Sequence, residues 1–163
     1  MTFAPKHILV PLAVEDNDEL AFAEQAVSAS CDLAKQFGSK VTLIHFASVP
    51  SPLPAQDENA DASARIYETM AMVLQERLKS AKEQLVKLQK KAEEQGVKTE
   101  LHVVDADESI AHAICHAATK EAADLILVGS HARRGLKQFL LGSVAERVVH
   151  LSPLNVLLLR HES

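Results

Sequence analysis

The apolar residues of this chain change their spacing several times, and each change marks a new structural element. Continuous apolar runs, typical of buried β-strands, occur at residues 7–11, 41–46, 124–128 and 154–159. Apolar and polar residues alternate in 97–103, which is typical of a strand at a sheet edge. Apolar residues recur at three- and four-residue steps, which predicts helices, over residues 17–37, 63–95, 105–122 and 142–150.

Strands and helices therefore alternate along the whole chain. This alternation predicts an α/β fold with a doubly wound, five-stranded parallel sheet and helices on both faces. Right-handed crossovers favour the strand order 3-2-1-4-5, with the first and fourth strands adjacent at the centre. The winding reverses between these two strands, and ligands bind in the crevice at their carboxyl ends. Pro11–Leu12 and Gly129–Ser130 border that crevice.

The length of 163 residues favours a single domain that spans residues 1–163. Residues 48–63 contain three prolines and many small polar side chains, which predicts a surface loop; a linker between two domains is the alternative. The helix over 63–95 carries one apolar stripe and ends at Gly96. A coiled coil is the competing interpretation of this stripe.

Composition narrows the class of protein. The fractions of hydrophobic residues, 47%, and charged residues, 24%, are ordinary for a globular protein and exclude disorder of the whole chain. No apolar run approaches the ~20 residues that cross a membrane, and the amino-terminal segment does not resemble a signal peptide. Cys31 and Cys115 stand alone, which fits a reducing cytoplasm. The net charge of −5 and the scarcity of aromatic residues argue against nucleic-acid binding.

Residues 129–143 carry the clearest chemical signal. No acid lies between residues 124 and 146, and the basic residues of this stretch are Arg133, Arg134 and Lys137. Gly129 and Gly142 allow a ligand to approach the backbone closely. The predicted helix opens at Gly142–Ser143, where free N–H groups and the helix dipole favour an anion. The pattern indicates a phosphate cradle; a solvated basic loop with an N-cap serine is the alternative.

The segment GSHARRGLKQFLLGSVAERVVHLSPLNVLLLR resembles the end of the universal stress protein family. The opening KHILVPL and the strand VTLIHF are similar to the same family, in order and position, so the resemblance covers essentially the whole chain. It implies an adenine nucleotide alpha hydrolase-like sheet, frequent dimers and, in one large subset, ATP bound at the crevice. That subset carries the pattern G-x2-G-x9-G-[S/T].

Carried over by position, the resemblance implies an adenine nucleotide, ATP or AMP, with Mg²⁺ only alongside it. The implied contact residues are Pro11, Leu12, Val41, Gly129, His131, Ala132, Arg133, Gly142, Ser143 and Val144. The backbone of Val41 would meet the adenine, and Pro11 and Leu12 would lie by the phosphates.

The sequence departs from the family pattern at two positions. Ala132 replaces the second glycine, and Ala13 stands where the family has an aspartate that holds the ribose, although Glu15 and Asp16 lie nearby. Loss of a hydrogen bond to a charged group removes about 1.5–3 kcal/mol, or about one to two decades of affinity. We therefore expect weak nucleotide binding. The second hypothesis is a nucleotide-free dimeric interaction module of the same family.

Other candidate chemistry is sparse. His112 and His116 share one helix face beside Cys115, a spacing that can hold a metal, but surface histidines are the better interpretation. A metal-dependent enzyme built on these histidines is the third hypothesis. His45 lies in a strand and is expected in or near the core. No nucleophile–base pair has a recognisable spacing, so no catalytic residue is assigned and at most slow ATP hydrolysis is expected.

The last strand indicates how two copies of the chain would associate. An apolar strand at a sheet edge favours pairing with another chain. The strand predicts a twofold homodimer through Val156, Leu157, Leu158 and Leu159. A helix that covers this edge within one chain is the alternative. The sequence as a whole predicts a cytoplasmic, dimeric, nucleotide-responsive regulator.

Overall fold

The computed structural model describes residues 3–47, 60–106, 109–130 and 142–160, and the side chains of residues 60–62 are not described. Its strands are β1 (His7–Pro11), β2 (Lys40–Ala47), β3 (Thr99–Asp105), β4 (Leu125–Ser130) and β5 (Asn155–Arg160). Its helices are α1 (Asn17–Phe37), α2 (Ala60–Glu94), α3 (Ile110–Lys120) and α4 (Ser143–Leu151). The five strands pair in parallel in the order β3-β2-β1-β4-β5, which confirms the predicted fold class and strand order.

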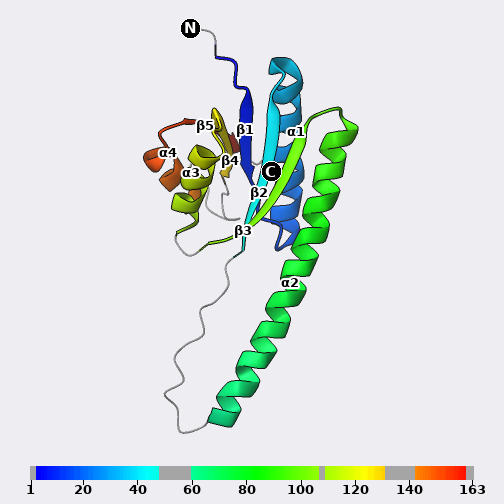
Figure 1. Ribbon diagram of the computed structural model, residues 1–163, viewed down its shortest axis with the longest axis vertical. Coiled ribbons are helices and arrows are strands. Elements are labelled where there is room, and N and C mark those ends of the chain that lie inside the picture. The colour runs from blue at the N-terminus through cyan, green and yellow to red at the C-terminus, as the bar shows by residue number, and fades with distance from the viewer. Residues whose placement is uncertain (1–2, 48–59, 107–108, 131–141, 161–163) are drawn as a thin grey trace.

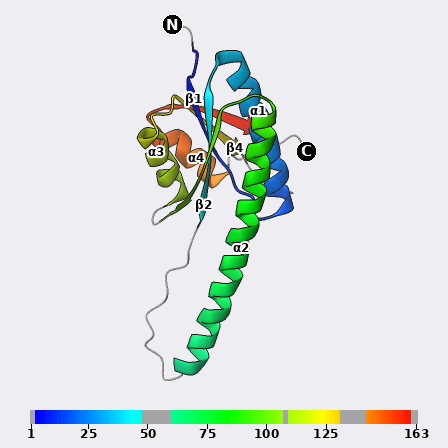
Figure 2. The ribbon, with the colours of Figure 1, turned by 45° about the vertical axis from the view of Figure 1, so that its right-hand side comes forward.

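Helices cover both faces of the sheet, with α1 and α2 on one side and α3 and α4 on the other (Figures 1 and 2). Successive side chains of a strand point to opposite faces, so the core divides into two clusters. Ile8 and Val10 pack with Phe22 of α1 in one cluster, while Leu9 packs with Ile114 of α3 in the other. The central strands β1 and β4 are buried on both faces, as their continuous apolar runs predicted.

Helix α1 begins at a side-chain cap. The Asp16 carboxylate accepts a hydrogen bond from the Glu19 N–H at 2.8 Å, and the Glu19 carboxylate accepts one from the Glu15 N–H at 2.9 Å. The first contact satisfies an amide of the first turn that the helix itself leaves without a partner, and the second ties the residue before the cap to that turn. Gly38 ends the helix with φ of 71°, a left-handed conformation that favours glycine.

Helix α2 packs on the domain along only part of its length. Its carboxyl-terminal half buries one side of the predicted stripe, namely Ala81, Leu85, Leu88 and Ala92. Its amino-terminal half extends past the carboxyl end of the sheet (Figure 1). There the same stripe continues as exposed side chains, with 60% of Ile66, 50% of Met70 and 49% of Val73 accessible. Only the carboxyl-terminal half of the stripe therefore packs into the core of this chain.

The region between β3 and α3 differs from the prediction. A helix was expected over residues 105–122, whereas α3 begins at Ile110. Asp105 is the last residue of β3, because the parallel ladder continues to its pairing with Ala47. The Ala106 N–H extends the ladder by donating to the Ala47 carbonyl at 3.2 Å.

Within the described ranges, no helix has both the length and the apolar character needed to span a bilayer.

Candidate functional site

The predicted crevice lies where β1 and β4 stop pairing. Their ladder contains Ile8 with Leu125 and Leu9 with Ile126. Beyond these pairs β1 continues to Pro11 and β4 to Ser130, each at the carboxyl end of the sheet. Since strand order reverses at this point, the sheet offers here the position at which doubly wound folds bind ligands.

Leu12 follows β1 at the crevice, and both its N–H and its carbonyl have hydrogen-bond partners within the protein. Its N–H donates to the Ile44 carbonyl at 2.8 Å, and its carbonyl lies 2.9 Å from Nδ1 of His45. His45 is 4% exposed, as expected of a core histidine. Because Pro11 has no N–H, these two residues shape the crevice without offering a free amide to a phosphate.

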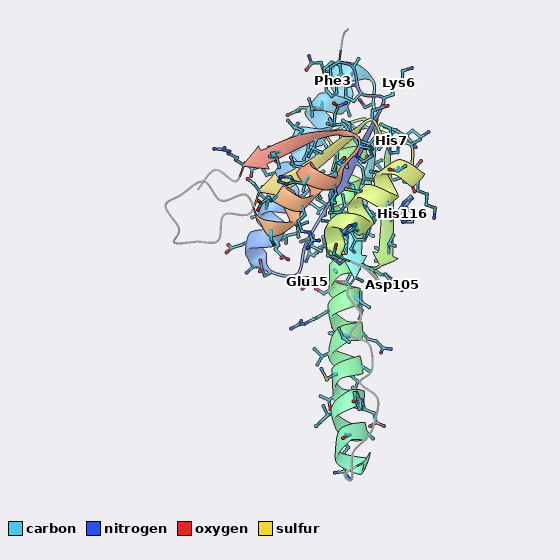
Figure 3. The ribbon with its side chains drawn as sticks, turned by 90° about the vertical axis from the view of Figure 1, so that its left-hand side faces the viewer. Phe3, Lys6, His7, Glu15, Asp105 and His116 are labelled. Carbon is cyan, nitrogen blue, oxygen red and sulfur yellow. The ribbon has the colours of Figure 1, made fainter. Side chains whose placement is uncertain are left out.

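The position expected to hold the ribose lacks a carboxylate, since the exposed residue there is Ala13. Asp16 does not replace it, because its carboxylate caps α1 through the Glu19 N–H. Glu15 is exposed and is the other acid in this turn. It lies at the same end of the domain as Asp105, and His7 lies toward the opposite end (Figure 3).

Gly129 at the end of β4 is held against a side chain of α1. A methyl group placed on Gly129 would overlap Cε1 and Cζ of Phe22 and would lie 2.9 Å from Cδ1. Phe22 is 7% exposed and belongs to the core. The close approach to this ring is by itself a reason for glycine, so Gly129 is not evidence for a ligand.

The amino end of α4 carries the other residues predicted to form the cradle. Gly142 is its N-cap residue, with extended backbone (φ −57°, ψ 147°) and no side chain to satisfy the amides of the first turn. Its carbonyl accepts from the Glu146 N–H at 2.9 Å, and Ala145 and Val148 anchor the helix in the core. Ser143 and Val144 are exposed, so their end of the helix is accessible. His131, Ala132 and Arg133, which the resemblance implies as contact residues, lie outside the described residues.

Val41 does not join this group. It pairs with Ile8 near the amino end of β2, whereas Pro11 pairs with Ile44, three residues further along. At about 3.3 Å per residue the separation along the strand is about 10 Å. Val41 is fully buried, and its N–H donates to the Lys98 carbonyl at 2.9 Å. The expectation that its backbone meets an adenine at the crevice was therefore wrong, because register places Val41 at the other end of the sheet.

The histidine pair on α3 has surface character. His112 and His116 are exposed, and Nδ1 of His112 lies 2.6 Å from the Ser109 hydroxyl. Cys115 points into the core, and burial raises the pKa of its thiol. A thiol that resists ionisation is a poor partner for a metal. The geometry thus gives no support to an enzyme built on these histidines.

Sequence reasoning missed a different group, Glu100, His102 and Glu121, which the structure brings together. The two-residue spacing of Glu100 and His102 on a strand could have indicated a shared face. Nothing local could have indicated Glu121, which follows α3.

Comparison with known proteins gives consistent results across nearly the full chain. The profile described as Universal stress protein family matches residues 5–160. A universal stress protein of Methanocaldococcus jannaschii is 34% identical over 147 residues, covering 88% of this chain and 75% of that protein. The universal stress protein YxiE of Bacillus subtilis is 30% identical over 152 residues, covering 91% of this chain and 96% of that protein.

Solved structures share the fold. Universal stress protein UspA from Lactobacillus plantarum superposes with a TM-score of 0.72 at 20% identity, covering 95% of this chain and 97% of that one. The protein from Archaeoglobus fulgidus, solved in complex with dAMP, has a TM-score of 0.61 at 20% identity, with coverage of 97% and 98%. Another universal stress protein was solved in complex with cAMP and has a TM-score of 0.58 at 21% identity, with coverage of 97% and 98%. Taken with the profile match and the two sequence relatives, this establishes that the chain belongs to the universal stress protein family.

Proposed function

We propose that this protein is a cytoplasmic, nucleotide-responsive regulator that binds ATP or AMP weakly in the crevice between β1 and β4. The observation that carries the proposal is the end of the β1–β4 ladder at Leu9 and Ile126, and the exposed start of α4 at Ser143 and Val144 supports it. A phosphate at such a helix start accepts hydrogen bonds from backbone amides and interacts favourably with the helix dipole. Relatives of the same fold that were solved with dAMP and cAMP support an adenine nucleotide as the ligand.

The binding is proposed to be weak because the ribose side of the crevice has lost a charged acceptor. Ala13 cannot accept a hydrogen bond from its side chain, and Asp16 is already used by the cap of α1. A charged hydrogen bond contributes about 1.5–3 kcal/mol, which corresponds to about one to two decades in the dissociation constant. Mg²⁺ would enter only with the phosphates of the nucleotide. Signalling by occupancy, rather than catalysis, suits a site in which no general base has been identified.

Calorimetric titration with ATP and with AMP, each with and without Mg²⁺, tests the proposal. Wild-type protein should give saturable heat, and Ala13→Asp should bind about 10–100-fold more tightly. Ala4→Asp is the matched control, because Ala4 is also exposed but precedes the amino end of β1, away from the crevice. Absence of saturable heat for wild type and Ala13→Asp at millimolar nucleotide would overturn the proposal and favour a nucleotide-free interaction module.

We also propose that two chains associate through β5. Within the part of the chain that the structure describes, β5 pairs with β4 alone and its other edge is open. Its side chains stay partly accessible, including 39% of Leu157, which two paired edges would cover. Light scattering should give twice the chain mass of 17.7 kDa. Leu157→Asp should give the monomer mass, whereas Met72→Asp on the protruding half of α2 should not; a monomeric wild type would refute the dimer.

A further inference from the structure

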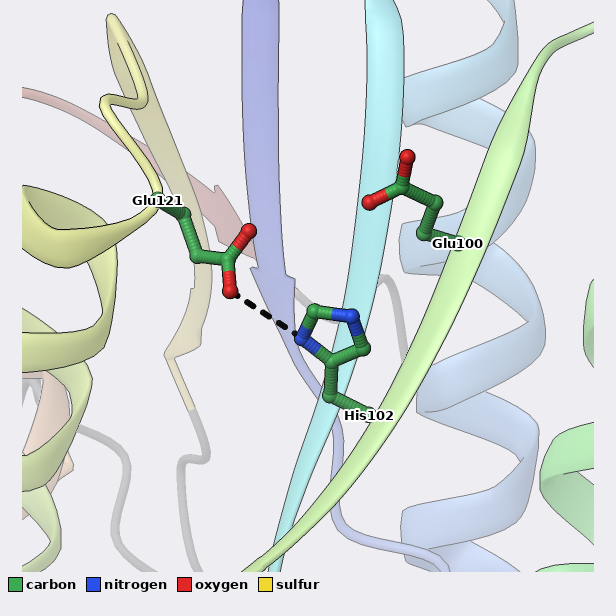
Figure 4. A group of neighbouring side chains, drawn as sticks. All are labelled: Glu100, His102 and Glu121. Atoms are coloured by element: carbon green, nitrogen blue, oxygen red, sulfur yellow. Dashed lines mark ion pairs between the residues drawn. The ribbon is translucent and has the colours of Figure 1, made fainter.

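Three side chains of types that can bind a metal lie together at the β3 edge of the sheet, on the face that carries α3 (Figure 4). Glu100 and His102 project from β3, and Glu121 follows the last turn of α3. One ligand atom from each residue lies within 4.8 Å of the other two. Nδ1 of His102 and Oε1 of Glu121 are 3.3 Å apart. The three side chains are partly buried rather than spread over open surface.

The backbone holds two of these residues on one face. Glu100 pairs with Thr42 and His102 with Ile44 in the parallel ladder between β2 and β3. Residues two apart on a strand point to the same side, so both side chains face α3. An aliphatic pair would extend the apolar core at this position. The strand instead presents a carboxylate and an imidazole there.

His7 fixes the backbone of Glu121. Nδ1 of His7 lies 3.1 Å from the Glu121 carbonyl oxygen, and Nε2 lies 2.8 Å from the Thr42 hydroxyl. Burial lowers the pKa of His7, and the charge on Lys40 lowers it further. In the neutral form Nδ1–H donates to the carbonyl and Nε2 accepts from the hydroxyl. This 4% exposed ring therefore links β1, β2 and the end of α3, and it sets the position from which the Glu121 side chain extends.

The donor set fits a divalent transition-metal ion. One imidazole nitrogen with two carboxylate oxygens gives three protein ligands, which is the number that open zinc sites use. Zinc bonds of about 2.0–2.2 Å place ligand atoms about 3.4 Å apart, close to the His102–Glu121 distance. The two positive charges of Zn²⁺ would balance the two carboxylates.

A cavity adjoins the group and leaves room for a fourth ligand. It has a volume of about 640 Å³ and includes His102 and Glu121 in its lining. Phe46, Val104 and Ala113 contribute apolar walls. The side chains of His116 and Lys120 also border it. A metal on the three ligands would therefore keep an open coordination position beside a space large enough for water or a small ligand.

We propose that Glu100, His102 and Glu121 bind one Zn²⁺ ion at the β3 edge of the sheet. This site is separate from the nucleotide crevice, which lies between β1 and β4. It uses none of the residues assigned to that crevice, so each of the two proposals stands or falls by itself.

Titration of metal-free protein with ZnCl2 at pH 7.5, followed by calorimetry, tests the site. Wild type should bind one equivalent, and zinc should raise its melting temperature. Glu100→Gln and Glu121→Gln keep the side-chain size but remove a charged ligand, so each should weaken binding by at least about 10–100-fold, the loss typical of an outer-shell partner alone. His112→Gln is the matched control, because it removes an exposed histidine of α3 that could pair with His116 and that does not line the cavity.

Circular dichroism of the metal-free variants shows whether each remains folded. The proposal is overturned if folded wild type binds no zinc up to millimolar concentration. It is equally overturned if Glu100→Gln binds like wild type, since Glu100 would then not be a ligand of the ion. Loss of binding in His112→Gln with retention in Glu100→Gln would assign the metal to the α3 surface instead.

Discussion

Replacement of Gly129 by alanine tests whether this glycine serves the core or a ligand. The added Cβ would overlap two ring atoms of Phe22 and would lie 2.9 Å from a third, Cδ1. Carbon atoms in good contact are about 3.5–4.0 Å apart, so even Cδ1 would have to retreat by about 0.6 Å or more. Phe22 is 7% exposed and is surrounded by core residues, which leaves the ring little freedom to move.

The expected effect is a loss of stability of about 1–3 kcal/mol, the usual range for overpacking of a core. For a chain of this size it corresponds to a fall in melting temperature of about 2–12 °C. Urea denaturation and thermal unfolding, both followed by circular dichroism, measure these quantities. Without a clash, glycine to alanine at an ordinary backbone conformation would stabilise by about 0.4–1 kcal/mol. The two interpretations thus differ in sign.

A double-mutant cycle with Phe22→Ala completes the test. Phe22→Ala alone should cost about 3–5 kcal/mol, and Gly129→Ala added to it should be neutral or stabilising. If Gly129→Ala leaves the melting temperature unchanged and weakens nucleotide binding instead, the packing argument is refuted. Glycine would then be required by the ligand at this position.

The other predictions concern pH, capping and packing. Because the folded state lowers the pKa of His7, the stability it contributes is present above the ordinary histidine pKa of about 6.5 and is lost as pH falls below it. The loss reaches at most about 1.4 kcal/mol per pH unit. In urea titrations from pH 7.5 to 5, the free energy of unfolding should decline less steeply with falling pH for His7→Gln than for wild type. Equal slopes of the two proteins would contradict the assignment of this pH dependence to His7. Asp16→Ala should cost about 0.5–2 kcal/mol through the lost cap of α1, whereas an unchanged urea midpoint would show that the cap contributes nothing. Leu85→Ala, at a fully buried site, should cost about 2–5 kcal/mol, and Met72→Ala, 72% exposed, should change stability by less than about 0.5 kcal/mol; similar values would mean that α2 packs differently.

Local pattern predicted the fold because each element carries its environment in its sequence. Residues 124–128 form a nearly continuous apolar run, and β4 is buried on both faces in the centre of the sheet. Residues 97–103 alternate, and β3 lies at an edge with partly accessible side chains. Hydrophobic burial sets these patterns, and crossover handedness then leaves few strand orders.

The register between neighbouring strands could not be predicted in the same way, and it determines which residues lie at the crevice. The length of a strand does not tell how far it slides against its neighbour, so Val41 was expected at the crevice and lies about 10 Å from that level. The length of the ladder between β2 and β3 was not predicted either. Asp105 pairs with Ala47 and so belongs to β3, and α3 begins later than expected, at Ile110. Errors of this kind follow from interactions with partners that are distant in sequence.

The sequence by itself determined the alternation of elements, the buried centre of the sheet and the family. Only the tertiary structure decided which side chains meet: Phe22 with Gly129, and Glu121 with His102. These contacts depend on how strands and helices pack in three dimensions. A helix can pack at several positions along a sheet while burying much the same apolar stripe. Periodicity therefore fixes which face of an element is buried, whereas close packing of all the elements together fixes the neighbours of each side chain.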